Sequence, residues 1–232
     1  MALLPWHKIE TVLLDMDGTL LDLHFDNHFW LELVPQKLAI RSGKPIERCK
    51  QELSSMYSQV QGCIEWYCLD YWSEKLDLDI VEAKQELKHL ITMREDAIPF
   101  LRALRESGRQ LVLVTNAHPG SLSLKVEQTK LDKYIDELVS THEFGVSKEF
   151  PSLWQQLHAR LNFRPEHTLF VDDNEGILDT AKAFGIAYTL GINNPDSKLP
   201  EKPMDRHLHI DDYRQLVDSI REIRFEAKQE SK

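Results

Sequence analysis

The most constraining feature of the sequence is an apolar run, Thr11–Leu14, that leads directly into two carboxylates, Asp15 and Asp17. The run favours a buried strand, and burying charge is costly unless the charge is paired or bound to a cation. Because alternate residues of an extended backbone point the same way, Asp15 and Asp17 can face one site. Gly18 then frees the backbone to turn sharply. The stretch therefore predicts a strand whose carboxyl end carries an acidic site.

Further strand-like runs follow at Leu111–Val114, Leu138–Ser140, Leu169–Val171 and, more weakly, Ile186–Leu190. All but Leu138–Ser140 are nearly continuously apolar, as expected for central strands covered by helices on both faces. Apolar stripes at helical spacing separate the later runs. This alternation of strand and helix with short loops predicts an α/β fold built on a doubly wound, parallel, five-stranded sheet of the Rossmann-like kind.

The stretch from residue 22 to residue 95 interrupts this alternation. It contains no convincing strand and carries two stripes at helical spacing, Ile46/Cys49/Leu53/Met56/Val60 and Ile80/Ala83/Leu87/Ile91. A structureless loop of that length is implausible in a compact domain. We therefore expect a core made of residues 1–21 and 96–232, with residues 22–95 forming an all-helical insertion between the first two strands.

Composition narrows the classes of function. The 232 residues are 42% hydrophobic and 28% charged, which is typical of soluble globular proteins. The formal net charge of −10 argues against a nucleic-acid-binding surface. No apolar run approaches the roughly 20 residues that span a membrane, and the first residues lack a basic leader. We expect a cytoplasmic protein, and the sequence gives no indication of its oligomeric state.

The three cysteines, Cys49, Cys63 and Cys68, are an odd number clustered in one third of the chain. They provide no disulfide framework and no C-x-x-C pair that would indicate zinc. We expect them to be reduced packing residues.

Polar residues also follow the other predicted strands. In open parallel sheets, ligands bind beyond the carboxyl ends of the strands. Thr115 and Asn116 follow the second strand, Lys148 follows the third after a short loop, and Asp172 and Asp173 follow the fourth. Each alone has a plain structural interpretation, such as a turn, a helix cap or a surface amine. Their occurrence together at one edge of the sheet favours a shared site.

These residue types suit phosphoryl transfer, with Asp15 attacking phosphorus. A divalent cation held by Asp15 and Asp173 would join nucleophile and phosphate, and Mg²⁺ prefers such oxygen ligands. The backbone carbonyl of Asp17 can add a ligand. The Lys148 ammonium and the Thr115 hydroxyl can hold phosphate oxygens. The Asp17 carboxyl would act as general acid and then as general base.

At these positions the chain resembles the haloacid-dehalogenase-like (HAD) phosphatases. Their pattern is an apolar strand and D-x-D-G-T, a strand ending in Ser or Thr, a Lys, and a strand ending in an acidic pair. The matching segments here are Asp15–Leu20, Val114–Asn116, Lys148 and Phe170–Asp173. The resemblance covers nearly the whole chain, and it implies that the helical insertion is a cap that closes over the site and selects the substrate.

The same resemblance implies roles for particular residues. Asp15 would be the nucleophile and Asp17 the acid/base, while the phosphate would be bound by Thr115, Asn116 and Lys148. The metal ligands would be Asp15, Asp17, Asp173 and, as a supporting or second ligand, Asp172.

The chain departs from the family pattern at two positions. Many members carry Pro directly after the Lys, but Lys148 is followed by Glu149. Many also carry a further Asp four residues after the metal-binding one, where this chain has Ile177. Aligned on that pattern, Asp173 is the better metal ligand of the acidic pair.

Further segments resemble bacterial purine 5′-nucleotidases that act on GMP and IMP. They are Phe25–Trp30, Trp66–Trp72, Thr115–Pro119 and Asn194–Ser197. The implied reaction is Mg²⁺-dependent release of phosphate from a purine 5′-monophosphate, through an aspartyl-phosphate. A phosphatase for a sugar phosphate or another small metabolite has the same core, so that alternative stays open.

Residues 66–72 of the insertion include four aromatic residues, Trp66, Tyr67, Tyr71 and Trp72. A flat base can stack on such rings. They can equally pack in the insertion's own core. Helical spacing places Tyr67 and Tyr71 on one face more readily than Trp66 and Trp72. The candidates for substrate contact are Trp66, Tyr67, Asp70 and Tyr71.

A receiver-type signalling module also combines acidic residues, Thr and Lys around Mg²⁺ on a parallel sheet. In such a module the acidic pair follows the first strand and the phosphorylated Asp follows the third. Here that order is reversed. A non-catalytic binding protein is disfavoured because every chemical position is filled.

Overall fold

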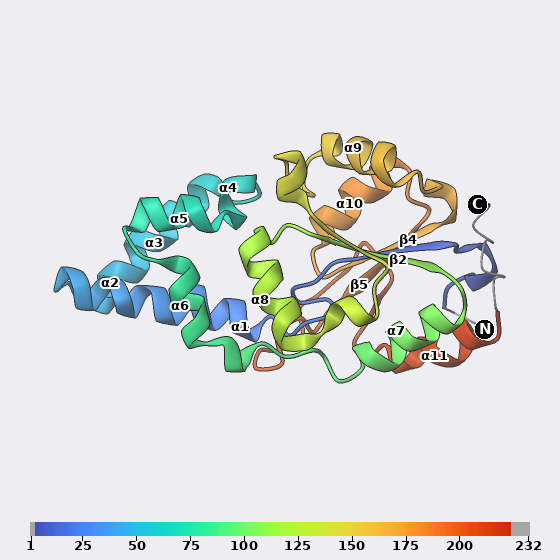
Figure 1. Ribbon diagram of the computed structural model, residues 1–232, viewed down its shortest axis with the longest axis horizontal. Coiled ribbons are helices and arrows are strands. Elements are labelled where there is room, and N and C mark those ends of the chain that lie inside the picture. The colour runs from blue at the N-terminus through green and yellow to red at the C-terminus, as the bar shows by residue number, and fades with distance from the viewer. Residues whose placement is uncertain (1–2, 224–232) are drawn as a thin grey trace.

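The computed structural model describes residues 3–223 of the chain. Its sheet is parallel throughout, with strands in the order β3-β2-β1-β4-β5-β6 (Figure 1). The bounds are Thr11–Leu14 for β1, Gln110–Thr115 for β2, Glu137–Ser140 for β3, Thr168–Asp172 for β4, Tyr188–Ile192 for β5 and His209–Ile210 for β6. The predicted parallel α/β sheet is confirmed, although β5 begins two residues later than expected.

The number of strands predicted, five, is wrong because β6 was missed. This strand is only two residues long, and it pairs with Gly191 and Ile192 at the end of β5. Two residues are too short to show the alternation or apolar run that marks a strand in a sequence.

Consecutive residues of the central strands point to opposite faces of the sheet and so enter two different cores. Val12 and Leu14 pack in one core, whereas Leu13 lies in the other. Both cores are covered by helices, α7 (Ala97–Glu106) and α11 (Arg214–Arg221) on the first face, α9 (Pro151–Leu161) and α10 (Glu175–Phe184) on the second. Figure 1 shows these two pairs above and below the sheet. Double coverage explains why the strands are apolar throughout.

The remaining core elements are short except for α8 (Pro119–Thr129), which leads away from the carboxyl end of β2. The others are the 3-10 turns η1 (Trp6–Lys8), η4 (Leu131–Lys133), η5 (Thr141–Phe144) and η6 (Pro165–His167).

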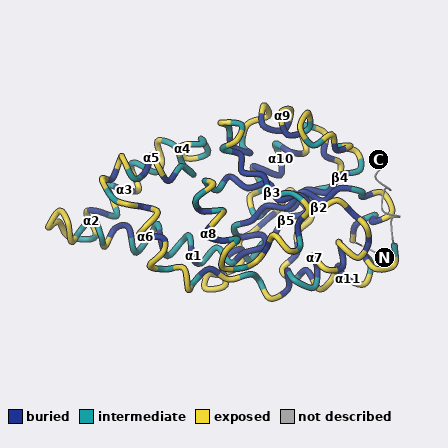
Figure 2. The backbone as a smooth tube through the Cα atoms, in the orientation of Figure 1, coloured by how far each residue is buried: buried dark blue, intermediate teal, exposed yellow. Residues whose placement is uncertain are grey.

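Residues 24–90 form only helices and turns. The elements are α1 (His24–His28), the π-turn η2 (Phe29–Leu33), α2 (Val34–Ser42), α3 (Ile46–Val60), α4 (Ile64–Tyr67), α5 (Leu69–Leu76), α6 (Ile80–Glu86) and the 3-10 turn η3 (Lys88–Leu90). They have a separate apolar core that includes Phe29, Leu53 and Trp72. Figure 2 shows buried backbone concentrated in the sheet, with much more exposure in this helical part.

The two connections between the sheet and this helical part run side by side. Asp22 N donates to the Thr92 carbonyl at 3.0 Å, and Arg94 N donates to the Leu20 carbonyl at 3.0 Å. The helical part begins and ends within a few residues of these contacts. It lies where β2 leads into α8, which is the carboxyl end of the sheet (Figure 1).

The aromatic run of the insertion is not one continuous helix. Cys68 has an extended backbone between α4 and α5, and its Sγ accepts the amide of Tyr71 at 3.5 Å as a helix cap. Trp72 Nε1 therefore reaches the Trp66 carbonyl at 2.9 Å, and the two rings meet edge to face at 6.3 Å. Trp66 and Trp72 therefore meet, although the spacing of a single helix favours Tyr67 and Tyr71 as the pair on one face.

Candidate active site

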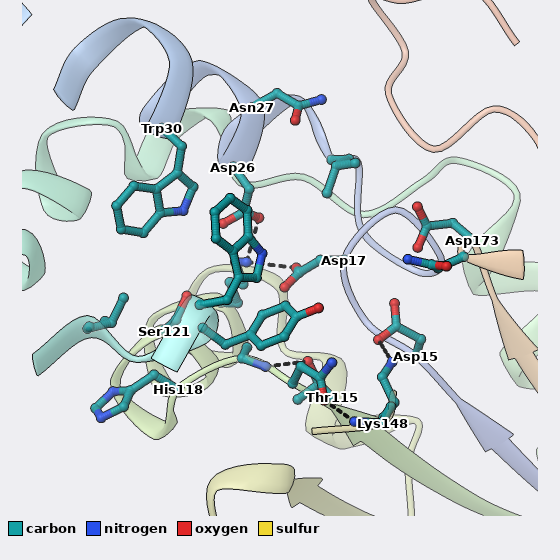
Figure 3. Close-up of a pocket in the computed structure, with 18 of the residues that line it drawn as sticks. Asp15, Asp17, Asp26, Asn27, Trp30, Thr115, His118, Ser121, Lys148 and Asp173 are labelled. Carbon is teal, nitrogen blue, oxygen red and sulfur yellow. Dashed lines mark hydrogen bonds and ion pairs between the residues drawn. The ribbon is translucent and has the colours of Figure 1, made fainter. Parts of the chain in front are cut away.

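The carboxyl ends of β1 and β4 place two buried carboxylates around one ammonium group. Lys148 Nζ pairs with Asp15 (Figure 3). It also pairs with Asp172, at 2.7 Å. The side chains come from three separate segments, and Lys148, Asp15 and Asp172 are 2%, 6% and 1% exposed. Burial is tolerable here because the charges are paired.

Burial is also the main influence on the ionisation of this group. Burial, with a smaller contribution from Asp172, raises the pKa of Asp15 to about 6 against the opposing effect of Lys148. Burial alone would lower the pKa of Lys148, but Asp15 and Asp172 raise it more, so the net shift is upward. Lys148 therefore keeps its charge at neutral pH, whereas Asp15 ionises close to neutrality.

A third carboxylate completes an acidic cluster. One oxygen from each of Asp15, Asp172 and Asp173 lies within 4.8 Å of the other two. Burial raises the pKa of Asp173 well above its usual range, with added repulsion from Asp172 and Asp15. Three carboxylates face one ammonium in an all-oxygen site, which suits a hard divalent cation such as Mg²⁺.

The two members of the acidic pair are held differently. The Asp172 carboxylate is engaged on both oxygens, since Oδ2 pairs with Lys148 and Oδ1 accepts the amide of Asn174 at 2.8 Å. Between residues 3 and 223, no hydrogen bond or ion pair is found for the Asp173 carboxylate. Of the pair, Asp173 therefore has its oxygens available to a cation.

Gly18 allows this close approach for two reasons. Its φ of +83° lies in the left-handed region, and a Cβ there would stand 2.9 Å from Cγ of Asp173. A side chain at this position would displace the third carboxylate.

The residues that follow β2 have different surroundings. Thr115 lines the cavity, and its Oγ1 accepts the amide of Ala117 at 3.1 Å. The Asn116 side chain is occupied by the protein: Oδ1 accepts the amide of Lys148 at 2.9 Å, and Nδ2 donates to Glu149 at 3.0 Å. The contacts of Asn116 hold the Lys148 loop, and its predicted role on phosphate stays a prediction.

Asp17 belongs to a second charged network that the sequence did not indicate. Lys125 Nζ lies 2.7 Å from Asp17 and 2.6 Å from Asp26, and Lys84 Nζ lies 3.0 Å from Asp26. Both lysines are buried. The signal in the sequence is weak: each lysine stands beside apolar residues of a helical stretch, Lys84 next to Ala83 and Lys125 next to Leu124.

The pKa values in this network differ between its two carboxyls. Burial raises the pKa of Asp17 to about 6, although Lys125 opposes the shift. Burial would raise the pKa of Asp26 as well, but Lys125 and Lys84 together lower it to about 2. Asp17 can therefore exchange a proton near neutral pH, whereas Asp26 stays ionised.

A cavity of about 310 Å³ joins both networks to the helical insertion. That size lies at the lower end of ligand pockets, roughly 300–1,000 Å³. Figure 3 shows Asp15, Lys148 and Asp173 at one end and Trp30 and His118 at the other. The aromatic residues in the lining are Trp30, Tyr57, Trp66, Tyr67 and Trp72. One end of the cavity is therefore ionic and the other largely aromatic.

The predicted substrate contacts divide into two groups. Trp66 and Tyr67 line the cavity, whereas Asp70 and Tyr71 lie outside its lining. Asp70 is exposed and approaches Nε2 of His118 at 3.5 Å. Sequence reasoning did not single out Trp30 or Tyr57, which reach the cavity through tertiary packing.

His118 also has a structural role. Its Nδ1 accepts the amide of Gly120 at 3.2 Å, which caps the first turn of α8. His142 packs edge to face on the His118 ring at 5.1 Å.

This arrangement of sheet, insertion and acidic cluster is that of a hydrolase family. The chain belongs to the haloacid dehalogenase-like hydrolases, whose family model matches residues 9–185. The family expected from the sequence motifs is thereby confirmed, and the chain is an enzyme of the hydrolase class.

Two curated relatives show the range of activities within that family. The GMP/IMP nucleotidase YrfG of Escherichia coli (strain K12) is 48% identical over 217 residues, covering 94% of this chain and 98% of the relative. The (S)-2-haloacid dehalogenase 1 of Pseudomonas sp. (strain CBS-3) is 26% identical, covering 80% of this chain and 85% of the relative.

Solved structures show the same fold. A HAD phosphatase from Thermococcus onnurineus superposes with a TM-score of 0.77 at 23% identity, covering 94% of this chain and all (100%) of that one. An L-2-haloacid dehalogenase from Xanthobacter autotrophicus gives a TM-score of 0.62 at 17% identity, with 93% and 99% covered. Between residues 3 and 223, no helix has the length and apolar character needed to cross a membrane.

Proposed function

We propose that the protein is a Mg²⁺-dependent phosphatase that hydrolyses purine 5′-nucleoside monophosphates, GMP and IMP, to nucleoside and phosphate. The observation that carries the proposal is the cavity with an ionic end and an aromatic end. A nucleoside monophosphate presents the same two halves, an anionic phosphate on the ribose and a flat base. The choice of a purine nucleotide is supported by the 48% identical GMP/IMP nucleotidase.

In the first step, the ionised carboxylate of Asp15 attacks phosphorus and forms an aspartyl-phosphate. The bond from phosphorus to the 5′-oxygen breaks, and the protonated Asp17 carboxyl donates its proton to that oxygen. A pKa of about 6 for Asp17 leaves a useful fraction of the acid form near neutral pH. Nucleoside leaves as the neutral alcohol.

In the second step, water attacks the phosphorus of the aspartyl-phosphate. Asp17, now a carboxylate, accepts a proton from this water, and the bond between phosphorus and the Asp15 oxygen breaks. Inorganic phosphate leaves, and both carboxyls return to their starting states. The Lys148 ammonium and the Thr115 hydroxyl hold the phosphate oxygens through both steps.

The residues present fit Mg²⁺, since the acidic cluster offers several carboxylate oxygens against a single ammonium. We assign the ion to Asp15, Asp173 and the Asp17 backbone carbonyl, with Asp172 as a supporting or second ligand. When bound, Mg²⁺ supplies the positive charge that offsets repulsion between the phosphate and the carboxylates.

We assign residues 22–95 to a cap and residues 1–21 and 96–232 to the catalytic core. Residues 1–2 and 224–232 of that core lie outside the described part of the chain. The paired connections support a cap that pivots on a narrow base. On this assignment Trp66 and Tyr67 contact the base or ribose, with Trp30 and Tyr57 added by the cavity lining. Asp70 and Tyr71 stay predictions.

A substrate panel tests the assignment. Phosphate release would be measured with GMP, IMP and glucose 6-phosphate, and chloride release with 2-chloropropionate, the substrate type of the dehalogenase relatives. We expect GMP and IMP to have the highest kcat/KM. Comparable rates on all three phosphate esters would replace the nucleotidase by a broader small-metabolite phosphatase, and chloride release would contradict a phosphatase.

A further inference from the structure

The residue that follows the site lysine, Glu149, makes a contact between the core and the helical insertion. Tyr67 Oη donates to Glu149 Oε1 at 2.6 Å. The other oxygen, Oε2, accepts from Asn116 Nδ2 at 3.0 Å. Glu149 stands where many members of the family carry proline, which has no carboxylate to make either bond.

The chain of hydrogen bonds continues from Asn116 to the lysine itself. Asn116 Oδ1 accepts the backbone amide of Lys148 at 2.9 Å and the hydroxyl of Thr141 at 3.0 Å. A phenol of the insertion is thus joined through two side chains to the backbone that carries the Lys148 ammonium. Each bond has good length, and each donor meets one acceptor.

The residue before the lysine makes a second contact of the same kind. Ser147 Oγ donates to the Gly62 carbonyl at 2.6 Å, in the turn between α3 and α4. Ser147 is fully buried. Ser147 and Glu149 therefore hold the insertion, while Lys148 between them points to Asp15 and Asp172.

Tyr67 is suited to donate this bond. Burial, followed by the neighbouring Glu149 carboxylate, raises its pKa well above the usual range, so the phenol stays protonated. A hydrogen bond to a charged acceptor is stronger than one between neutral groups. Tyr67 also lines the cavity, so the bond forms where the insertion closes over the ionic end.

We propose that Glu149, with Tyr67 and Ser147, forms a latch that holds the insertion closed and keeps Lys148 in its phosphate-binding position. Glu149 is on this view a positioning residue, acting on the phosphate site through Asn116. The inference rests on the proposed role of residues 22–95 as a cap over a phosphatase site. The proposed latch gives a function to Glu149, which stands where many members of the family carry proline.

The variants Tyr67→Phe and Glu149→Gln test the latch. The first keeps the ring and removes only the donor, whereas the second places an amide nitrogen against Tyr67 or Asn116. Tyr188→Phe is the matched control, because Tyr188 begins β5 at the opposite end of the sheet. We expect each latch variant to lose about tenfold in kcat/KM, mainly through a higher KM, as for one charge-assisted hydrogen bond. Because one chain of bonds is broken in either case, the double variant should lose no more than the single ones.

Hydrogen exchange supplies a readout that does not depend on the substrate. In the wild type, inorganic phosphate with Mg²⁺ should slow amide exchange in residues 62–72 and 147–149 together. In both latch variants the 62–72 response should be lost, with the midpoint of global unfolding unchanged. Additive losses in the double variant, or a retained 62–72 response, would overturn the latch.

These outcomes separate the latch from the nucleotidase proposal. Wild-type enzyme that rejects GMP and IMP but turns over another phosphate ester contradicts the nucleotide assignment only, and the variants are then compared on that ester. If no ester is turned over, the exchange response to phosphate still decides whether the latch exists.

Discussion

Two buried lysines, Lys148 and Lys125, each stand between two carboxylates. Their networks differ in the numbers of carboxyl and ammonium groups and in the parts of the fold that bring these groups together. Lys148 faces Asp15 and Asp172, with Asp173 as a third carboxylate nearby. In the other network, two ammonium groups, Lys125 and Lys84, balance two carboxyls. The first network has more carboxyls than ammonium groups and could bind a cation, whereas in the second network the two numbers are equal.

The pKa values express this difference at Asp26, whereas the pKa of Asp17 in the second network is raised to about 6, like that of Asp15. Burial raises the pKa of Asp15 to about 6, with only one ammonium opposing it. Two ammonium groups overcome burial at Asp26 and lower its pKa to about 2. A network that is short of positive charge is ready to accept a cation, and one that is balanced is suited to hold two parts of a fold together.

The largest effect is expected at the centre of the first network. Asp15→Asn should reduce phosphate release by more than about a thousandfold, because an amide cannot form the aspartyl-phosphate. The fold should be retained, since Asn has the same shape and still accepts from Lys148. Phosphate release would be measured alongside binding of GMP by calorimetry. Retained turnover would remove Asp15 from the role of nucleophile.

Removal of the cation should affect the same network just as strongly. EDTA should stop turnover, and added Mg²⁺ should restore it, because the carboxylates would otherwise repel the phosphate. The measurement is phosphate release at stepwise Mg²⁺ concentrations after dialysis. Full activity without a divalent ion would contradict the charge argument made from three carboxylates and one ammonium.

The two networks also differ in how far they were predictable. Asp15, Thr115 and the Asp172–Asp173 pair stand at the carboxyl ends of β1, β2 and β4, so the sheet topology itself brings them together. Lys148 lies beyond β3 and the turn η5, and its approach to this edge also depends on the contacts of its loop. The sequence could therefore predict that these residues meet, while their roles stay predictions.

The second network depends on how the insertion packs on the core. Lys125 and Lys84 lie on two helices that are far apart in sequence, and they meet only because both reach Asp26. No local pattern marks such a meeting. The same holds for Trp30, which lies within the π-turn η2 and reaches the cavity lining through tertiary packing.

A stability measurement tests the role of the second network. Asp26→Asn should lower the free energy of unfolding by about 3–5 kcal/mol, because the buried Lys84 and Lys125 ammonium groups both lose the Asp26 carboxylate. Denaturant unfolding would measure the change. The control is Glu52→Gln in the exposed pair with Lys44, where the loss should be much smaller because water screens the pair.

The contribution of Asp26 should also depend on pH in a defined direction. Since its pKa is lowered to about 2, the stabilisation should be fully present above about pH 4 and lost as the pH falls toward 2. Equal losses in Asp26→Asn and Glu52→Gln would show that the insertion does not depend on this network.

The smallest expected effect is a shift in the pH dependence of kcat/KM. It concerns Asp17, which pairs with Lys125 in the second network and acts as the acid in the proposed reaction. Asp17 must be protonated to donate to the leaving oxygen, so kcat/KM should fall as pH rises through its pKa of about 6. Lys125 opposes the upward shift, so Lys125→Met should raise that pKa and move the fall to higher pH, by about one unit. The measurement is kcat/KM for GMP across the pH range in both proteins. Lys84→Met is the control. Because Lys84 pairs with Asp26, its loss should shift the fall in kcat/KM along the pH axis by less. If the fall in kcat/KM of Lys125→Met stays at the same pH or moves to lower pH, Lys125 does not set the pKa of Asp17.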